Sequence, residues 1–212
     1  MQPKTNPLSP DLSYSWRRSV FFALIFLIGP CLLAQEQPLI ELNQHRLDVN
    51  EKAMYVLGGW AIGNIAVGAI MRSRTEGTTR YFHEMNAFWN LVNLGLAAGG
   101  LFGNMGTDPA GLDLWETYHE QNKLERILLF NMALNVSYMV GGAWLMERSK
   151  VVTERADRWK GYGQSLILQG GFLLLYDTTH YLLQQRFSAP RLEKIMQHVQ
   201  VDGQGIGLLI QF

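Results

Sequence analysis

Two short patterns in the sequence place a carboxylate and an imidazole three residues apart. Asp177 and His180 have this spacing, and Glu116 and His119 repeat it. Residues three apart lie on one face of an α-helix, so each pair presents both side chains to the same neighbour. Asp177 also stands alone as a charge within a long apolar stretch, which favours a functional role. We expect His180 to be its partner, because an imidazole can share a proton or carry the opposite charge.

A second pattern is a row of polar side chains that follows the helical repeat through apolar sequence. Between residues 83 and 93, one histidine and three asparagines are spaced i, i+3, i+7 and i+10, which predicts one face of a helix. Further polar side chains interrupt three other apolar stretches. We expect all of them to form one polar strip across the interior of a helical bundle. Its members are Asn64, His83, Asn86, Asn90, Asn93, Asn131, Asn135, Asp177 and His180.

The polar strip has two interpretations. Amides in an apolar medium bond across helices and contribute about 0.6 kcal/mol each, so the strip can be structural. A strip with an aspartate and a histidine also suits binding, small-solute or proton passage, or assembly. The sequence contains no G-x-S-x-G element, no Walker lysine and no H-E-x-x-H pattern, and it indicates no cofactor. A function other than catalysis is therefore favoured, and catalysis stays open.

The two carboxylate–histidine pairs allow a different function. Paired carboxylate-x-x-His motifs from two helices assemble metal sites in helical bundles. The alternative is therefore a metal-dependent membrane enzyme with an outward-facing site. Its candidate ligands are Glu116, His119, Asp177 and His180. The competing interpretation of the first pair is a solvated face on a short interfacial helix, which the neighbouring Trp115 and Tyr118 suggest.

The elements that position these residues follow from the distribution of charge. The chain has 212 residues with 18 Lys+Arg and 18 Asp+Glu, and its formal net charge of zero argues against binding to nucleic acid. A single cysteine excludes a disulfide scaffold and a cysteine-based zinc site. Asp177 is the one charge within five long stretches. These stretches are 19–35, 53–71, 85–107, 127–146 and 161–185.

The last four of these stretches predict transmembrane helices. Each has the ~20 residues that cross a hydrocarbon core of about 30 Å at 1.5 Å per residue. We therefore expect an all-α fold, a four-helix transmembrane bundle in a lipid bilayer, with spans at 53–71, 85–103, 127–146 and about 163–183.

Small residues recur at intervals of four in the first two spans. The patterns are Gly59-x-x-x-Gly63 and Gly95-x-x-x-Gly99-x-x-x-Gly103, and the third and fourth spans contain the pairs Gly141-Gly142 and Gly170-Gly171. Such glycines let helix backbones approach closely, within one chain or between chains. They allow a homo-oligomer or a contact with another membrane protein. A third hypothesis is therefore a structural subunit of a membrane complex.

The N-terminal region has the layout of a signal sequence. Arg17 and Arg18 precede a short apolar run, and Ala34 is the expected cleavage position. Residues 1–34 are thus predicted to be a signal peptide or an uncleaved signal anchor. Residues 35–52 would follow as an exported segment.

The remaining domain boundaries and the orientation follow from these assignments. Residues 53–186 form the predicted four-span membrane domain, and 187–212 form a C-terminal tail. The loops 72–84 and 147–160 carry eight Lys and Arg residues, whereas 104–126 carries two. Positively charged loops stay in the cytoplasm, so we expect a multi-pass protein of the bacterial inner membrane with 72–84 and 147–160 inside.

Two runs of residues resemble a known family. They are Gly58–Gly68 and Tyr81–Gly95, and the second contains the histidine–asparagine face. Both resemble a family of small, uncharacterised bacterial membrane proteins, found mainly among Bacteroidota, with four spans after an exported N-terminus. The resemblance covers about residues 45–190 and implies the same architecture. It adds no catalytic residue, because no activity is assigned to that family.

Overall fold

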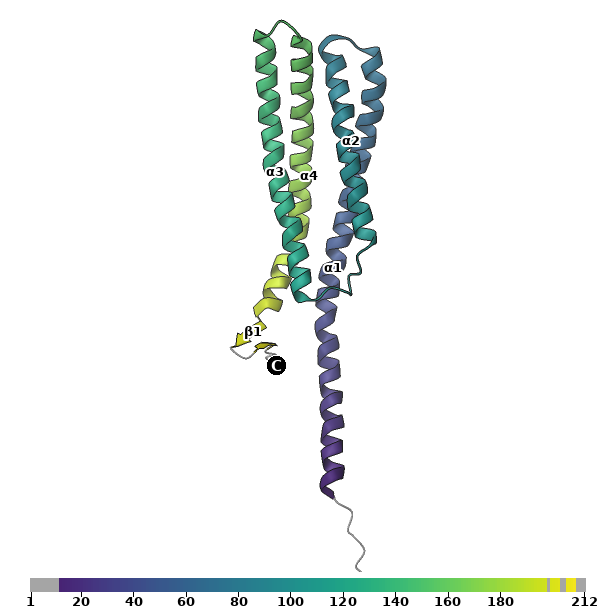
Figure 1. The fold of residues 1–212 in the computed structure, drawn as a ribbon, viewed down its shortest axis with the longest axis vertical. Helices are drawn as coiled ribbons and strands as arrows, with labels where there is room; N and C mark the ends of the chain where they lie inside the picture. Colours follow the sequence, from purple (N-terminus) through teal and green to yellow (C-terminus); the bar gives the residue numbers. More distant parts are fainter. Residues whose placement is uncertain (1–11, 198, 203–204, 209–212) are drawn as a thin grey trace, which may run out of the picture. The chain divides into compact units, whose positions relative to one another are not determined.

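Four long helices make up most of the structure, a computed structural model that describes residues 12–197, 199–202 and 205–208, with side chains described for 37–197. The helices are α1 (Leu12–Arg74), α2 (Gly77–Met105), α3 (Leu114–Val151) and α4 (Ala156–Gln197) (Figure 1). A small antiparallel hairpin follows, formed by β1 (Val199–Asp202) and β2 (Gly205–Leu208). The all-α prediction is confirmed for the four helices, and the hairpin is an addition to it.

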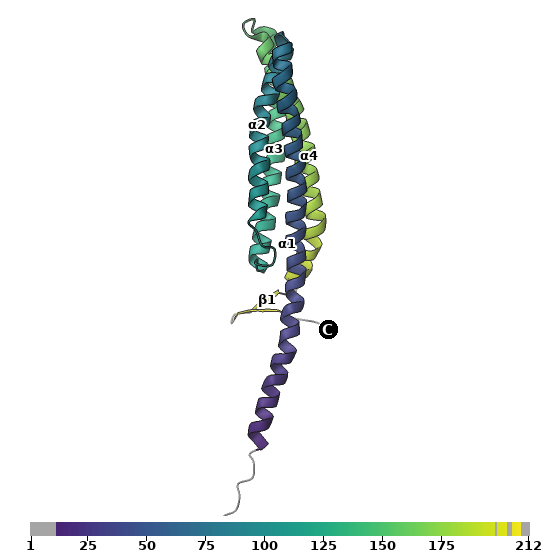
Figure 2. The same ribbon diagram turned by 90° about the vertical axis from the view of Figure 1, so that its right-hand side faces the viewer.

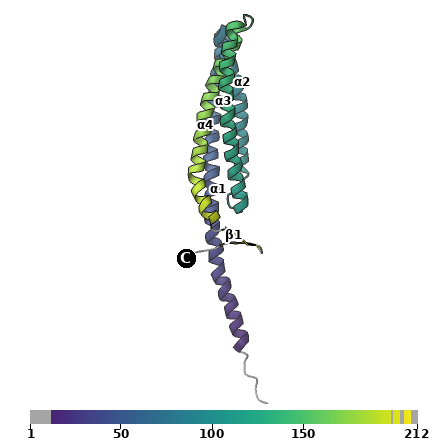
Figure 3. The ribbon, with the colours of Figure 1, turned by 90° about the vertical axis from the view of Figure 1, so that its left-hand side faces the viewer.

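The helices α2, α3 and α4 and the second part of α1 form one bundle. The chain divides into two compact units, Met1–Pro38 and Leu39–Phe212, and the described part of the first is the beginning of α1. Within the second unit α1 runs beside α2 and α3 beside α4 (Figure 1). The views turned by 90° place α1 beside α4 and α2 beside α3 (Figures 2 and 3). The helix α4 packs against α2 and α3, and its Phe172 ring stacks on Trp60 of α1.

Local sequence signals explain where two of the helices begin. The turn before α2 uses Gly77 with φ of +55°, a backbone conformation that costs glycine little. The helix α3 begins with a capping box. The Asp113 carboxylate accepts from the backbone N–H of Glu116 at 2.8 Å, and Glu116 accepts from that of Asp113 at 3.0 Å. Because α3 begins at Leu114, residues 114–126 belong to this long helix rather than to a loop.

The close contacts between helices use glycines outside the Gly-x-x-x-Gly patterns. Gly142 of α3 lies against Gly163 of α4, and Gly161 of α4 lies against Thr78 and Phe82 of α2. Among the described residues, a Cβ atom at any pattern glycine would meet nothing within 4 Å, and these glycines are Gly59, Gly63, Gly95, Gly99 and Gly103. The patterns therefore do not pack this chain's own helices, and their role between chains stays a prediction.

The bundle has a polar interior and an apolar exterior. Among the described residues 24 large hydrophobic side chains are exposed, with Phe102 and Leu175 each more than 70% accessible. Seven apolar residues of the described part of the chain are buried: Leu42, Leu57, Ala61, Ala97, Leu128, Leu173 and Leu192. Twice as many buried residues are polar or charged. This distribution is the reverse of that in a bundle that folds in water.

Two stretches of the described residues, Gln37–Arg74 and Leu114–Val151, are long and apolar enough to cross a membrane. The helices α2 and α4 are also long, and both have asparagine, glutamine or aspartate side chains buried within their apolar stretches. The expectation of four spans is therefore met for two helices by length and composition.

The helix α1 also includes the segment that precedes the first predicted span. The structure places residues 39–52 in this helix, and Asn43 and Arg46 are buried. The Asn43 amide donates to the Thr117 hydroxyl at 2.8 Å, and the Gln184 amide donates to the backbone oxygen of Arg46 at 3.0 Å. This segment thus packs on α3 and α4. The predicted cleavage position, Ala34, lies outside the residues whose side chains are described.

Candidate functional site

One group of buried polar side chains joins α1, α2 and α4, and we call it the amide cluster. Its centre is Gln169, which is fully buried. The Gln169 side-chain oxygen accepts from the Trp60 indole N–H at 3.0 Å, and its NH2 group donates to Asn86 Oδ1 at 3.0 Å. The Ser165 hydroxyl donates to the same Asn86 oxygen at 2.7 Å. The Gln169 NH2 group also donates to Asn64 Oδ1, at 3.4 Å.

The asparagines of α2 extend from the amide cluster along one face of their helix. The Asn90 NH2 group donates to the backbone oxygen of Asn86 at 2.8 Å, and the Asn93 NH2 group donates to Asn90 Oδ1 at 3.2 Å. All three side chains are buried, as the spacing of the polar strip predicts. Asn93 also borders a cavity, so the row connects the amide cluster with an open space inside the bundle.

This space, the central cavity, has a volume of about 310 Å³ and is bordered by all four helices. Its polar side chains are Asn50, Asn93, Asn131, Asn135, Asp177 and His180. Leucines cover much of the remaining wall, together with the rings of Trp89 and Tyr138, whose centroids lie 4.7 Å apart in an edge-on arrangement. Five of the nine predicted members of the polar strip therefore border one cavity.

Asp177 is the buried carboxylate of the central cavity, with 5% of its surface exposed. Its Oδ2 atom accepts a hydrogen bond of 2.6 Å from the Asn135 NH2 group. The expected partner was His180, but within the described part of the chain no hydrogen bond or ion pair joins the two. Both ring nitrogens of His180 are buried without a hydrogen-bond partner. Asp177 and His180 do line the same cavity, as their helical spacing predicts. The hydrogen-bond partner of Asp177 comes from α3, because Asn135 lies level with it.

Three members of the polar strip have less buried positions. Asn64 and Asn131 are half-buried, the first at the amide cluster and the second at the central cavity. His83 is half-buried as well, and its ring lies edge-on to Phe82 with centroids 5.2 Å apart. His83 does not line the central cavity and takes no part in the hydrogen bonds of the amide cluster. This end of the predicted strip is therefore separate from the rest.

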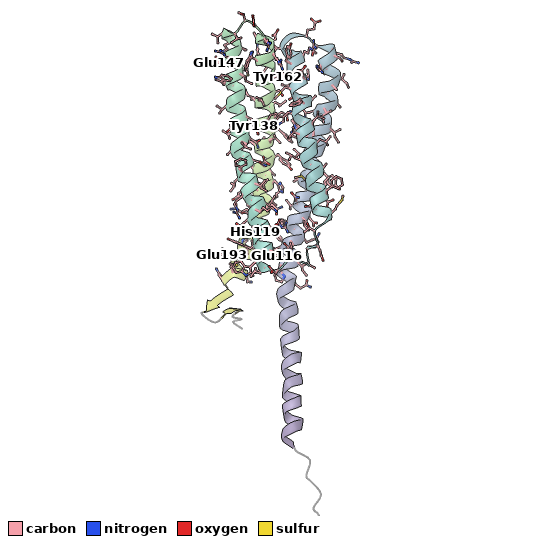
Figure 4. The ribbon with its side chains drawn as sticks, viewed as in Figure 1. Glu116, His119, Tyr138, Glu147, Tyr162 and Glu193 are labelled. Carbon is pink, nitrogen blue, oxygen red and sulfur yellow. The ribbon has the colours of Figure 1, made fainter. Side chains whose placement is uncertain are left out.

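The two carboxylate–histidine pairs lie far apart. Glu116 and His119 are exposed near the beginning of α3 (Figure 4), and the Glu116 carboxylate caps that helix. At 1.5 Å per residue, His119 lies roughly 24 Å along α3 from Asn135, the partner of Asp177. Among the described residues no three His, Cys, Asp or Glu side chains come close enough to hold a metal ion. The structure thus does not assemble the four predicted metal ligands.

A charged cluster closes the opposite end of the bundle, where Figure 4 labels Tyr162. The Tyr162 hydroxyl donates to the Glu84 carboxylate at 2.7 Å, and Arg72 forms an ion pair with Glu84 at 2.9 Å. The hydroxyl and then Arg72 hold the pKa of Glu84 below its ordinary value. Burial, followed by the contact with Glu84, raises the pKa of Tyr162.

Several buried polar residues of α4 are absent from the predicted strip. They are Ser165, Gln169, Gln184 and Ser188. A signal for them exists in the sequence, because the first two are four residues apart, the last two are four apart, and Asp177 and His180 lie between them on the same face. Trp60 of α1 was not among the predicted residues either, and its indole N–H bonds to Gln169 inside the bundle.

Comparison with known proteins gives one match. The model of a family described as "Family of unknown function (DUF6992)" matches residues 56–178. This range includes the amide cluster, the row of asparagines on α2, and Asp177, and it ends before His180. No curated protein and no solved structure matches the chain.

Proposed function

Since the chain belongs to DUF6992, a family of unknown function, its role has to come from its own residues, and we propose a membrane-embedded bundle that binds a small solute in its interior. The observation that carries this proposal is the central cavity. Polar side chains from all four helices border it, and the outer surface of the same bundle is apolar. A largely apolar cavity with a few convergent polar groups is the usual form of a small-molecule site.

The exposed apolar side chains support the membrane part of the proposal. In water, contiguous apolar surface of this kind marks a binding surface or promotes aggregation. In a bilayer the same side chains contact acyl chains, while polar groups find partners inside the bundle. Four spans at 53–71, 85–103, 127–146 and about 163–183 account for the interior and the exterior together.

The orientation comes from the loops. Loops 72–84 and 147–160 hold most of the loop arginines and lysines and lie at one end of the bundle, which supports a cytoplasmic position for both in a bacterial inner membrane. A reporter domain fused after residue 150 is expected on the cytoplasmic side. A reporter found outside the cell would contradict the orientation.

Cysteine accessibility tests the solute-binding site. With Cys31 replaced by serine, Asn131→Cys places a thiol at the cavity, and Val140→Cys places one on the outer face of the same helix. In intact membranes a water-soluble thiol reagent should modify residue 131 and leave residue 140 unmodified. Rapid modification at 140 would contradict membrane embedding. No modification at 131 would contradict a cavity that solutes reach.

Assembly is a second role that one observation favours. The glycines of the two Gly-x-x-x-Gly patterns have open space beside their backbones, so another helix can approach closely there. We propose that these surfaces contact a second copy of the chain or another membrane protein. This role is compatible with a solute site in the interior.

A further inference from the structure

The central cavity contains a carboxylate without a counter-ion. Within the described residues no lysine, arginine or histidine forms an ion pair with Asp177, and its one hydrogen bond comes from the neutral amide of Asn135. Burial of a charge costs much free energy unless a partner compensates it. A cationic ligand would supply this compensation.

The neighbouring polar groups can also accept hydrogen bonds. His180 is 2% exposed, borders the cavity, and has no partner on either ring nitrogen. Tyr176 also borders the cavity, and its hydroxyl is buried without a partner among the described residues. A neutral imidazole nitrogen and a phenol oxygen both accept from an N–H donor. Together with the Asp177 carboxylate, they form a set of acceptors that fits a group with several N–H bonds.

The leucines and aromatic rings of the cavity favour an organic rather than an inorganic cation. Inorganic cations such as Ca²⁺ need six to eight oxygen ligands, and Mg²⁺ needs an octahedron of oxygens. Asp177 is the one carboxylate among the described residues that line the cavity, so it can balance only half the charge of a divalent ion, and much of the remaining wall consists of leucines with the rings of Trp89 and Tyr138. Those rings offer apolar surface to a hydrocarbon body. The volume of about 310 Å³ is at the lower end for small-molecule pockets.

We propose that the central cavity binds a small amphiphilic amine, with its ammonium group at Asp177 and His180 and its hydrocarbon part against Trp89 and Tyr138. This inference rests on the proposed solute-binding function and specifies the class of solute. The ammonium donates to the free oxygen of Asp177 and to a ring nitrogen of His180.

The test compares phenethylamine with phenethyl alcohol, a neutral probe of nearly the same shape. Binding to the purified full-length protein in nanodiscs is measured by calorimetry at neutral pH. Hydrogen bonds to charged groups are stronger than neutral ones, so the amine should bind on the order of tenfold to a hundredfold more tightly. Equal affinities, or binding of neither probe, would overturn the inference.

Variants locate the preference. Asp177→Asn keeps the shape of the side chain and an oxygen for Asn135, and it should abolish the preference for the amine. Asp108→Asn, in the exposed loop before α3, should leave the preference unchanged. If Asp177→Asn fails to fold, the comparison of the two probes on the unaltered protein still tests whether the cavity prefers an amine. If the two probes bind equally and the thiol reagent modifies Asn131→Cys, the proposed solute-binding function stands and the preference for an amine is refuted.

Discussion

The adjacent glycines of α3 allow a sharp test of the bundle's packing. Gly142 faces α4, and a Cβ atom there would lie 2.6 Å from the backbone oxygen of Gly163 and 2.9 Å from Ile167 Cγ1. Real Cβ atoms essentially never come closer than 3.0 Å. A Cβ atom at the preceding residue, Gly141, would meet nothing within 4 Å among the described residues. The two alanine substitutions are thus chemically identical and differ only in what the methyl group meets.

The expected magnitudes follow from two opposing effects. Alanine is favoured over glycine within a helix by about 0.8–1 kcal/mol, and this gain applies at both positions. At Gly142 the methyl group must also push α3 and α4 apart, and overpacking costs about 1–3 kcal/mol or more. We expect Gly141→Ala to stabilise the protein by about 0.5–1 kcal/mol and Gly142→Ala to destabilise it by roughly 1–2 kcal/mol.

Unfolding of the purified variants in mixed micelles, followed by far-UV circular dichroism over a denaturant series, measures both changes. The difference in the free energy of unfolding between the two variants does not depend on helix propensity, because both variants replace a glycine by alanine within a helix. Gly170→Ala and Gly171→Ala repeat the comparison on α4, where a Cβ at Gly170 would lie 2.8 Å from the backbone oxygen of Asn135 and one at Gly171 would meet nothing. Equal stabilities within either pair would refute the packing described for α3 and α4.

Three further predictions address the ends, the amide cluster and the outer surface. The lowered pKa of Glu84 means that its contribution to stability is complete above the carboxyl's ordinary pKa and is lost as the pH falls through the lowered value. In Glu84→Gln the melting temperature should therefore fall less as the pH drops below ~4.5. The same fall as in the unaltered protein would contradict this. Gln169→Leu removes hydrogen bonds to three partners and should cost about 2 kcal/mol in the same unfolding assay, and a neutral result would show that the amide cluster is not stabilising. Gly99→Leu should reduce association in cross-linking without lowering monomer stability, and unchanged cross-linking would exclude this surface as an interface.

The sequence predicted the helical fold and much of the polar interior. The row of asparagines on α2 follows the helical repeat, and burial of Asn86, Asn90 and Asn93 agrees with that period. The helix number was also right, because loops with many charges separate the apolar stretches. These features depend on spacing along a single helix, which a sequence displays directly.

Features that depend on relations between helices were not predicted. The partner of Asp177 is Asn135 rather than His180, because the axial offset between α3 and α4 decides which side chains are level. The glycine pairs of α3 and α4 do lie at close contacts, through Gly142 and Gly170. The Gly-x-x-x-Gly glycines of α1 and α2 do not pack the described helices together, since that spacing cannot tell an inward face from an outward one. Gln169 was missed because a single glutamine in an apolar stretch has no special pattern until its neighbours on α4 are considered together.

The polar face of α4 has a consequence for how the protein is made. Asn86 and Asn64 depend on side chains of α4, which leaves the ribosome after the other three helices. Until α4 arrives, Asn64 and Asn86 have no partner from that helix, and in the proposed membrane setting unpaired polar groups in hydrocarbon are costly. The helix α4 therefore completes these hydrogen bonds, and in the proposed membrane setting chains interrupted before residue 156 should be degraded by membrane proteases.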